Sequence, residues 1–598
     1  MRKRTHAALL ALVAAGTVHA EVPLSRSLKK AMLDDADHVP VVVRWKANAQ
    51  RPQLLSASDV PAFGISAATL SEARIQELAK SDAVDAIYHD APMPLEQPDI
   101  PKTVDELDAQ EHKLRRTWGL AAIGADRVHA ELGITGKGVR VGIVDTGIDG
   151  LHPFFRDKLR GFKDFTGVLS PEADDTQGHG SHVAGTIAGG ITPDGVAIGV
   201  APGCELVVSR VLGPRQGRLS MILAGMAYVT ESGARVINCS FGSSGSPESD
   251  PLWNDVLGYL ASRNVLPVVA AGNDGRNGPG TVGSPGYLEG SFTVGAVRPD
   301  LQRADFSSYS EEKLGNRPKS YLKPDIAAPG FSVLSTREKN VIGRMNGTSM
   351  ATPHVVGVVA LMLEANPSLT PPRIREIIEE TATDLGDTGR DSQYGAGLIN
   401  AYKAVSRAKE LVGAPVVQKS DDDLLTEGQR LMVGNNLPAA ASRFMQIVQR
   451  ADWKDTKVQA AAYYLSEAYY HQGNFRGAVN GFAKLAELAP KSEFGIKAVF
   501  QVAKSYKETP VDNPAQTNLT YTKAAEWFSK FIAENPDHEW VPTAMIEVAN
   551  SYASLNQPDR AKQVLGAFLQ RFAGHPEAAH AYALMEKLEG GTRDPLAQ

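Results

Sequence analysis

The stretch Gly347-Thr348-Ser349-Met350-Ala351-Thr352-Pro353-His354 places a small hydroxyl residue where a loop enters an apolar helix, expected over residues 355–363. Proline lacks an N–H and fits only the first turn of a helix, so Pro353 puts Ser349 at or just before the helix N-terminus. Unpaired backbone N–H groups and the positive end of the helix dipole surround a hydroxyl at that position. Ser349 is therefore either an ordinary N-cap or a nucleophile whose developing oxyanion is stabilised.

Three further motifs precede this stretch along the chain. They are Val144-Asp145-Thr146-Gly147-Ile148-Asp149, Gly178-His179-Gly180-Ser181-His182-Val183-Ala184-Gly185-Thr186 and Ala270-Ala271-Gly272-Asn273-Asp274-Gly275. With these four motifs in the order Asp, His, Asn, Ser, the chain resembles the subtilisin-like serine proteases, the subtilases, over about residues 118–411. Four separate matches in the order of the family favour the nucleophile interpretation of Ser349 over the N-cap.

The resemblance implies a role for each of four side chains. A serine hydroxyl is a poor nucleophile at neutral pH and needs an adjacent base, for which His179 is the candidate. Asp145 would hold the imidazole tautomer and stabilise the imidazolium. Asn273 would donate its side-chain amide to the oxyanion, with the backbone N–H of Ser349 as the second donor. In the resembling family the second histidine of the motif, here His182, is structural.

Other interpretations of the same residues are weaker. Asp145 alone would fit a turn at the end of a strand, because Asp-Thr-Gly is good turn chemistry. An aspartic-protease site would need a second Asp-Thr-Gly to complete a carboxylate dyad, and no second copy occurs. A zinc pair of His179 and His182 lacks a third ligand at metal-site spacing, so we expect no metal at this site.

Three segments resemble the pocket that the family uses for the residue before the scissile bond. Ser240-Phe241-Gly242 and Ala270-Ala271-Gly272 correspond to its two walls, and Thr281-Val282-Gly283 corresponds to its floor. Glycine at position 283 leaves space and no charged residue lines these segments, so we expect a preference for large apolar or aromatic residues. Asp274 at the rim would also admit a basic residue.

No cofactor is expected to be required, and calcium cannot be assigned to a site. Many subtilases carry an Asp ligand shortly after the His-Pro of the first motif, but His152-Pro153 is followed here by Phe154-Phe155. The loop 189–200 is nearly free of carboxylates, so that calcium site is expected to be absent. Asp174-Asp175 remains a candidate for another one.

Short apolar runs alternate with helical stretches through the central part of the chain. The expected strands cover residues 139–144, 206–212, 236–240 and 265–271, and the expected helices include 221–231 and 252–263. This pattern predicts an α/β domain, a parallel sheet with helices on both faces, over residues 117–411. Asp145 directly follows one expected strand, Ser240 ends another and Asn273 follows a third, so they should meet at the carboxyl edge of the sheet.

The N-terminal region is predicted to contain a secretory signal peptide followed by a small domain. A basic start, the apolar run 7–16 and Val18-His19-Ala20 predict a signal peptide over 1–20, too short to span a bilayer. We therefore expect a secreted or periplasmic protein without a transmembrane segment. Residues 21–116 predict an α+β domain that resembles the family's inhibitory propeptide, with 99–116 as an exposed processing linker. A retained N-terminal domain is the alternative.

Within that domain we expect a strand over 39–45, a helix over 70–80 and a second strand over 83–88. Pro40 suggests that the first strand is an edge strand or that Pro40 lies in its first residues.

Composition and cysteine content narrow the class of protein. The chain has 598 residues, enough for three or four domains, and a net charge of -6 gives no basic excess for nucleic acid. Cys204 should start one strand and Cys239 should lie near the end of another, which places them too far apart for a disulfide. Both are expected to be buried, and Cys239 as a nucleophile lacks a partner motif.

The C-terminal region is predicted to be helical. A linker over 412–423 leads to tetratricopeptide-like repeats over 424–590. The copy with the best spacing has Ser where Gly is usual, and it consists of Leu465, Ser466, Tyr469, Ala478, Phe482 and Pro490. Further copies contain Val502, Tyr506, Ala524, Phe528 and Pro536, then Val548, Tyr552, Ala561 and Leu565, and weakly Ala440 and Phe444. Such repeats ordinarily bind a protein partner on their concave face, and a stabilising appendage is the alternative.

These observations together predict a secreted serine endopeptidase that hydrolyses peptide bonds of proteins through an acyl-enzyme on Ser349. Two alternatives keep the same fold: a catalytically inactive binding scaffold, and a peptide ligase in which an amine replaces water.

Overall fold

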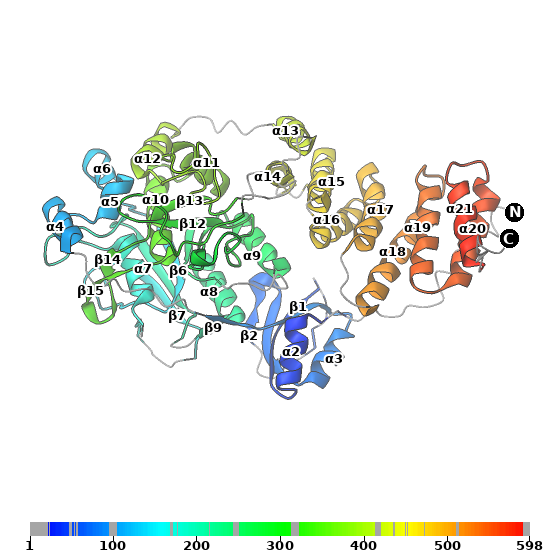
Figure 1. Cartoon of the computed structure of the whole chain (residues 1–598), viewed down its shortest axis with the longest axis horizontal. Coiled ribbons are helices and arrows are strands. Elements are labelled where there is room, and N and C mark those ends of the chain that lie inside the picture. Colours follow the sequence, from blue (N-terminus) through cyan, green and yellow to red (C-terminus); the bar gives the residue numbers. More distant parts are fainter. Residues whose placement is uncertain are drawn as a thin grey trace, which may run out of the picture. The chain divides into compact units, whose positions relative to one another are not determined.

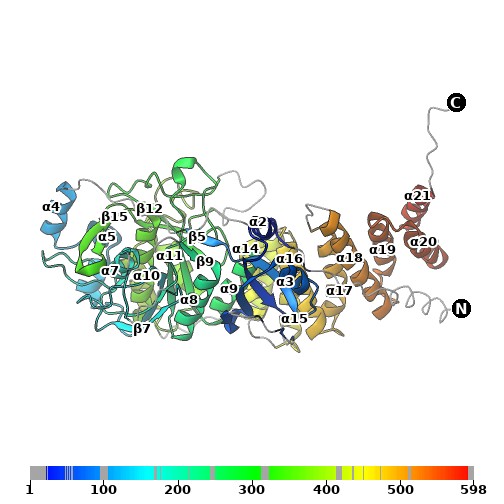
Figure 2. The same cartoon turned by 90° about the horizontal axis from the view of Figure 1, so that it is seen from below.

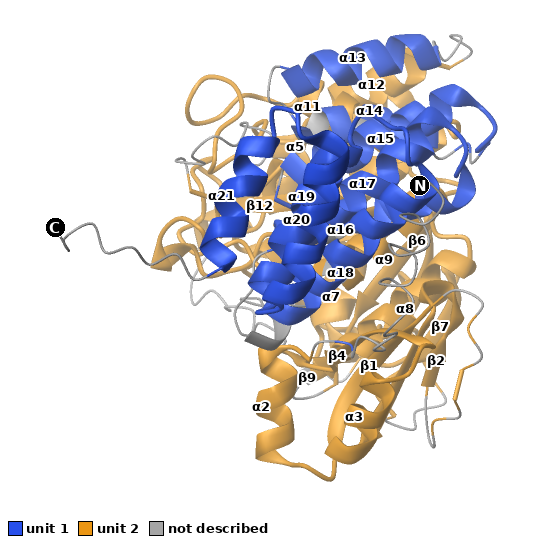
Figure 3. Ribbon diagram, turned by 90° about the vertical axis from the view of Figure 1, so that its right-hand side faces the viewer, with its two compact units in different colours: residues 1–23, 418–598 blue, residues 24–417 orange. Residues whose placement is uncertain are grey.

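The computed structural model describes most of the chain. The described residues are 22, 24–46, 49, 51–52, 54, 58–94, 105–167, 172–175, 177–213, 216–242, 250–311, 322–412, 420–433, 437–448, 450, 452–471, 473–509 and 514–589. The chain divides into two compact units, residues 24–417 and residues 418–598 together with 1–23 (Figure 3). The predicted signal peptide over 1–20 lies outside the described residues.

A seven-stranded parallel sheet forms the centre of the larger unit (Figure 1). In spatial order the strands are β13 (Ile326–Pro329), β12 (Phe292–Val297), β11 (Leu266–Ala270), β10 (Val236–Cys239), β6 (Arg140–Asp145), β8 (Glu205–Arg210) and β7 (Leu159–Asp164). Every pairing is parallel. The inner strands are buried almost throughout, because helices cover both faces. The predicted α/β fold is confirmed.

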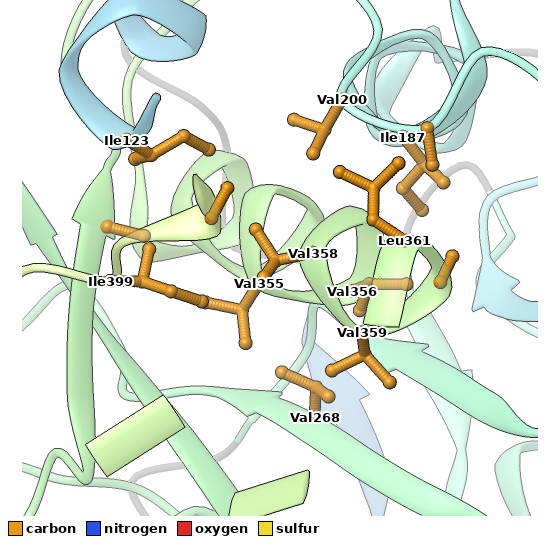
Figure 4. Close-up of a cluster of buried hydrophobic side chains, with 14 of the residues drawn as sticks. Ile123, Ile187, Val200, Val268, Val355, Val356, Val358, Val359, Leu361 and Ile399 are labelled. Atoms are coloured by element: carbon orange, nitrogen blue, oxygen red, sulfur yellow. The ribbon is translucent and has the colours of Figure 1, made fainter. Parts of the chain in front are cut away.

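Two helical layers bury opposite faces of this sheet. On one face lie α7 (His179–Ala188), α10 (Thr348–Ala365), α11 (Pro371–Thr381) and α12 (Ala401–Glu410), and on the other lie α8 (Leu219–Glu231) and α9 (Asp250–Ser262). Side chains alternate along a strand, so Val268 and its neighbour Val269 belong to these two different cores. Val268 meets Val355 and Val359 of α10 in the first core (Figure 4).

Helix α10 differs from the expectation at its start. It begins at Thr348, so Pro353 lies in its second turn, and the argument that proline must occupy the first turn is wrong here. Without an N–H, Pro353 leaves the carbonyl oxygen of Ser349 without its helical donor. The hydroxyl of Ser240 donates to that oxygen instead, at 3.0 Å. Ser349 nevertheless lies in the first turn. Among the described helices α10 alone is long and apolar enough to cross a membrane, and it is 89% buried.

The N-terminal part of the larger unit is the predicted α+β domain. Its antiparallel sheet has the order β2 (Ser58–Val60), β3 (Ile65–Leu70), β1 (Val39–Trp45), β4 (Val84–His89), with the short helical turn Pro61–Phe63 between β2 and β3. Ser25 caps helix α2 (Arg26–Asp34) and Ser71 caps helix α3 (Glu72–Ala79) through their hydroxyls. Strand β1 lies between β3 and β4, so the edge-strand alternative is wrong and Pro40 is instead its second residue.

The second half of the linker expected over 99–116 is helical, which the sequence did not predict. Residues Asp105–Leu114 form helix α4, and Glu111 on it is fully buried. The backbone of Arg116 then forms an isolated parallel β-bridge with Ala197. The chain continues through α5 (Trp118–Ile123), α6 (Ala125–Arg127) and a π-helical turn (Val128–Leu132) into β6. Residues 99–104 lie outside the described part of the chain.

Two small sheets flank the central one. Strands β14 (Val333–Thr336) and β15 (Ile342–Met345) form an antiparallel hairpin that includes the short turn Glu338–Asn340. Strand β5 (Pro92–Pro94) pairs antiparallel with β9 (Gln216–Arg218), and the two lie side by side in Figure 2. A further short helical turn covers Gly275–Asn277.

The smaller unit is helical throughout its described residues. Its helices are α13 (Asp421–Val433), α14 (Leu437–Val448), α15 (Thr456–His471), α16 (Phe475–Leu488), α17 (Glu493–Lys507), α18 (Pro514–Glu534), α19 (Val541–Ser554), α20 (Pro558–Phe572) and α21 (Ala578–Leu588). The repeat residues Ala478, Phe482, Ala524, Phe528 and Leu565 are buried in one continuous core. The predicted helical-repeat domain is confirmed.

Two details of this unit differ from or refine the sequence expectation. Asp421, Asp422 and Asp423, assigned to the linker, form the first turn of α13, where carboxylates favour the positive end of the helix dipole.

Ser466 stands where glycine is usual in the repeat, and glycine occurs instead on the facing helix. A Cβ on Gly481 would lie 2.2 Å from the Ser466 hydroxyl, so the close approach of α15 and α16 depends on that glycine.

Candidate active site

Asp145 and His179 form a buried hydrogen bond at the carboxyl edge of the central sheet. Asp145 is the last residue of β6, and His179 is the first residue of α7. Nδ1 of His179 lies 2.7 Å from Oδ1 of Asp145, and the two residues are 1% and 0% exposed. A carboxylate only accepts hydrogen bonds, so Nδ1 carries the proton and Nε2 is the nitrogen that can act as a base.

Hydrogen bonds to Asp175 fix the start of α7. Its Oδ1 accepts from the N–H groups of Gln177 and Gly178 and from the hydroxyl of Thr146, and its Oδ2 accepts from the N–H of Ser181. Thr146 in turn accepts from the N–H of Gly180 at 2.9 Å. Asp175 therefore links the loop after Asp145 to the helix that carries His179.

Gly180 allows these two segments to come close together. A Cβ at this position would lie 2.2 Å from the carbonyl oxygen of Gly147. No other residue type fits without moving the loop that follows Asp145 away from α7.

Ser349 reaches the same edge from α10. Its hydroxyl donates to the carbonyl oxygen of Ser240 at 3.3 Å, and the Ser240 hydroxyl donates back to the Ser349 carbonyl. Asn238 orients this exchange by donating to the Ser240 hydroxyl at 2.8 Å. Ser240 follows β10, and β10 is the direct neighbour of β6, which carries Asp145.

Asn273 lies against the loop that leads into Ser349. Its Oδ1 accepts from the N–H and the hydroxyl of Thr348, at 2.9 and 3.1 Å. The N–H of Thr348 can only donate and its hydroxyl can donate, so the Asn273 atom that faces them is the carbonyl oxygen. This assigns Oδ1 and Nδ2 of the amide. Nδ2 then faces Gly347. If Gly347 had a side chain, its Cβ would lie 3.6 Å from this Nδ2 atom.

The residues expected to line the substrate pocket gather between β10 and β11. The N–H of Gly283 donates to the carbonyl of Ala271 at 3.2 Å, and the N–H of Gly272 donates to the hydroxyl of Thr348 at 3.1 Å. Gly242 faces the carbonyl of Ser284, which a Cβ would approach to 3.6 Å. Phe241 is different: its ring is 4% exposed and stacks on Trp253 of α9. The ring of Phe241 therefore packs in the core against α9 and does not line the pocket.

The second histidine of the motif is engaged away from the site. His182 is fully buried and its Nε2 donates to the carbonyl of Val333 at 2.9 Å. Burial lowers the pKa of His182 to about 3, so it is neutral at physiological pH.

The described residues bring no group of three or more His, Cys, Asp or Glu side chains together at metal-binding distances. Asp174 pairs with Arg210, and Asp175 accepts the hydrogen bonds given above. The carboxylates considered for calcium are thus engaged with protein donors.

Both cysteines are free and buried. Burial raises the pKa of the Cys204 thiol to about 12. Burial, and to a smaller extent the nearby Asp145 carboxylate, raise the pKa of the Cys239 thiol. Neither thiol forms a thiolate readily, which argues against Cys239 as a nucleophile.

The α+β domain packs on α8 and α9, which cover one face of the central sheet. Asp90 accepts from the N–H and hydroxyl of Ser220, at 2.9 and 2.7 Å, in the first turn of α8. Arg44 pairs with Asp255 of α9, and Met93 of β5 is buried in the core that α8 and α9 share. Strand β5 therefore lies along β9. Gln177, just before His179, donates to the carbonyl of Gly213, just before β9.

Sequence reasoning did not identify several of these supporting residues. Asp175 was considered only for calcium, and Thr146, Thr348 and Asn238 were not singled out. Thr146 and Thr348 lie inside the quoted motifs, Asn238 is two residues before Ser240, and Asp175 is three residues before Gly178, so proximity in sequence was the available signal.

Sequence models of two known families match parts of this chain. The sequence model of the Subtilase family matches residues 136–397, and that of the Tetratricopeptide repeat matches residues 460–492. Subtilisin Savinase from Lederbergia lenta is 38% identical over 288 residues, which cover 48% of this chain and 97% of that protein. M-protease from Shouchella clausii (strain KSM-K16) is 39% identical over 288 residues, 48% of this chain and 69% of that protein.

Subtilisin E from Bacillus subtilis (strain 168) is 35% identical over 340 residues, 56% of this chain and 80% of that protein. The matched family segment contains all four motif residues, Asp145, His179, Asn273 and Ser349. The chain therefore belongs to the subtilase family and is a serine-type endopeptidase.

Proposed function

We propose that Asp145, His179 and Ser349 form the catalytic triad of this endopeptidase. The observation that carries the proposal is the buried 2.7 Å hydrogen bond between Asp145 and His179, at the edge where the Ser349 loop arrives. It fixes the tautomer in which Nε2 of His179 can take a proton from a serine hydroxyl.

The reaction is acyl transfer in two steps. The Ser349 hydroxyl attacks the peptide carbonyl while His179 removes its proton, and the proton then passes to the leaving amine. Water, deprotonated by His179, hydrolyses the acyl-enzyme and regenerates Ser349. Asp145 stays ionised and stabilises the imidazolium that forms in each step.

Asn273 supplies one donor to the oxyanion of both tetrahedral intermediates. Thr348 holds its Oδ1, so Nδ2 is already oriented before substrate arrives. Such pre-oriented donors stabilise the charge that develops in the transition state, because they need not reorganise during the reaction. The backbone N–H of Ser349 is the second donor.

The residue before the scissile bond would bind between the segments 240–242 and 270–272, above Gly283. Their lining is uncharged and mostly backbone, which suits a large apolar or aromatic side chain. A library of peptides varied at this one position tests the preference, and a preference for acidic residues would contradict it.

The α+β domain acts as an inhibitory propeptide in this proposal. Its strand β5 pairs antiparallel with β9, as an extended substrate would by β-strand addition. The Asp90→Ala variant of the full chain should therefore become active sooner, since α8 loses its cap from the propeptide. Export through the N-terminal signal fits this arrangement, and sequencing the N-terminus of the protein recovered outside the cell tests it.

The helical repeats would recruit a protein partner or substrate. Deleting residues 420–598 should leave cleavage of short peptides nearly unchanged and should slow cleavage of a protein that the repeats bind. Equal loss of both activities would instead favour a purely stabilising role.

A serine-directed fluorophosphonate followed by peptide mapping tests the triad. We expect the label on Ser349 of the processed protein, and no label after His179→Ala. No label on the folded wild-type protein would favour an inactive scaffold. Incubation of the acyl-enzyme with an added amine, with products identified by mass spectrometry, separates hydrolysis from ligation.

A further inference from the structure

Helix α4 precedes the peptidase domain in the chain, yet buried charges fasten it to that domain. Glu111 of α4 is 0% exposed, and its Oε1 accepts from the N–H of Trp118 at 2.7 Å. Arg344 of β15 donates to Oε2 of Glu111 and to Oδ1 of Asp108. A fully buried carboxylate is stable only with such partners. These contacts attach α4 to the peptidase domain, which is not expected of a segment that is only a processing linker.

Arg344 connects these contacts to the nucleophile loop. Its Nη1 donates to the carbonyl of Ser332 at 2.7 Å, and the N–H of Ser332 donates to Oδ1 of Asn346 at 2.5 Å. The N–H of Gly347 donates to the carbonyl of Gly330 at 2.9 Å. Asn346 and Gly347 lead directly into Thr348 and Ser349. The segment 330–332 therefore holds the turn that presents the nucleophile.

Helix α5 also contacts the segment 330–332, through Trp118. The indole N–H of Trp118 donates to the carbonyl of Phe331 at 3.1 Å, while the backbone N–H of Trp118 is bound by Glu111. The buried carboxylate of Glu111 thus binds two residues that contact the segment 330–332. Arg344 contacts the carbonyl of Ser332, and Trp118 contacts the carbonyl of Phe331.

The backbone at Ser332 needs this support. Its φ is +53°, a left-handed conformation that is unfavourable for residues other than glycine. Ser332 is fully buried, so surrounding contacts must hold it there. The hydrogen bonds from Arg344 and to Asn346 are the contacts that do so.

The same hairpin also contacts the helix that carries His179. The carbonyl of Val333 accepts from His182, the Ser335 hydroxyl donates to the carbonyl of His182, and the Thr336 hydroxyl donates to the carbonyl of Ser181. The β14–β15 hairpin therefore touches both the base-bearing helix and the nucleophile loop.

Building on the triad and the propeptide proposed above, we propose that α4 remains part of the active peptidase after the α+β domain is removed, and that Asp108, Glu111 and Arg344 are positioning residues for Ser349 and His179. They act through the β14–β15 hairpin and do not touch substrate. Maturation must then separate the α+β domain from α4 without separating α4 from β15.

The first test is the N-terminus of the mature protein. Intact mass and N-terminal sequencing of the processed, active full chain should place it at or before Asp105. An N-terminus within or after α4 in fully active enzyme overturns the proposal.

The second test measures kcat for each active site counted by phosphonate titration. Glu111→Gln and Arg344→Met should lower kcat per titrated site by about 10- to 100-fold, the range that small misplacements of reacting groups cause, with KM little changed. Asp108→Asn, whose side chain is 43% exposed, should have a smaller effect in the same direction.

The matched control is Glu131→Gln, which removes an exposed pair with Arg127 at 2.9 Å and should leave kcat per site unchanged. If Arg344→Met does not fold, the near-isosteric Glu111→Gln and the milder Asp108→Asn carry the test. A purely structural role would lower only the fraction of sites that titrate. Unchanged kcat per titrated site in both variants therefore overturns the proposal.

Discussion

The catalytic edge of the larger unit and the core of the repeat unit are stabilised by different interactions. At the catalytic edge, buried polar groups hold one another through hydrogen bonds, as Asp175 does for the first turn of α7. In the repeat unit, aromatic rings such as Phe482, Phe528 and Phe568 fill the space between successive helices. A polar substitution at the edge should therefore change the chemistry more than the stability. An apolar truncation in the repeats should do the reverse.

The largest effect is expected from Ser349→Ala. Removing the nucleophile should lower kcat by roughly 10⁶-fold, the size of the corresponding effect in subtilisin, a relative of this chain. Stability should hardly change, because among the described residues the Ser349 hydroxyl donates a single hydrogen bond, which is long at 3.3 Å. Active-site kinetics and hydrogen exchange of α10 measure the two quantities. Ser262→Ala, at an exposed hydroxyl, is the control, and residual activity within tenfold of wild type would refute the triad.

Asn273 offers a finer test of the same edge. Asn273→Asp keeps the oxygen that Thr348 binds but replaces the amide donor with a negative charge. Asn273→Ala should lower kcat by about 10²- to 10³-fold, as the equivalent change does in subtilisin, and Asn273→Asp should lower it further. KM for a short peptide should change little in either variant. An aspartate variant as active as wild type would exclude Asn273 as an oxyanion donor.

Phe482→Ala tests the other side of the comparison. The ring is fully buried between helices of the repeat unit, so its loss should destabilise that unit by about 3–5 kcal/mol. Hydrogen exchange in α15, α16 and α17 should accelerate, while kcat for a short peptide stays at the wild-type value. Leu488→Ala on the same helix is the control, since Leu488 is 43% exposed and should cost less than about 1 kcal/mol.

The parts that the sequence predicted well are those with local signals. The strands of the central sheet are short apolar runs. Asp145 ends β6, and Ser240 and Asn273 lie soon after the ends of β10 and β11, so parallel topology brings them to one edge. The repeat spacing likewise depends on small and aromatic residues at fixed intervals within about 34 residues.

The parts that the sequence did not predict depend on partners far away in the chain. Helix α4 has no apolar stripe, because it buries a carboxylate, Glu111, whose partner is Arg344. Nothing within residues 105–114 indicates that ion pair. The early start of α10 has a similar cause: Ser240 replaces the donor that Pro353 lacks. Asp421–Asp423 were expected in a linker together with the preceding Pro and Lys, although acidic residues favour the first turn of a helix.

The smallest expected effect is a difference in pH dependence between the two units. In the larger unit, burial lowers the pKa of Lys323 to about 8, although Asp325 lies 2.6 Å away. Between that value and the ordinary lysine pKa of about 10.5, the unfolded chain holds a proton that the native protein has released. The contribution of Lys323 to the free energy of unfolding therefore rises with pH across this window. In the repeat unit the sign is opposite, because burial raises the pKa of Glu467.

Between the ordinary glutamate pKa of about 4.3 and that raised value, native Glu467 holds the extra proton, so the free energy of unfolding of the repeat unit falls as pH increases. Lys323→Met and Glu467→Gln should each remove the slope from their own unit only. Hydrogen exchange of β12 and of α15, measured across the pH range and corrected for intrinsic exchange, reports the two units separately. Parallel slopes in both units, or one variant changing the slope of the other unit, would contradict independent stabilisation of the catalytic edge and the repeats.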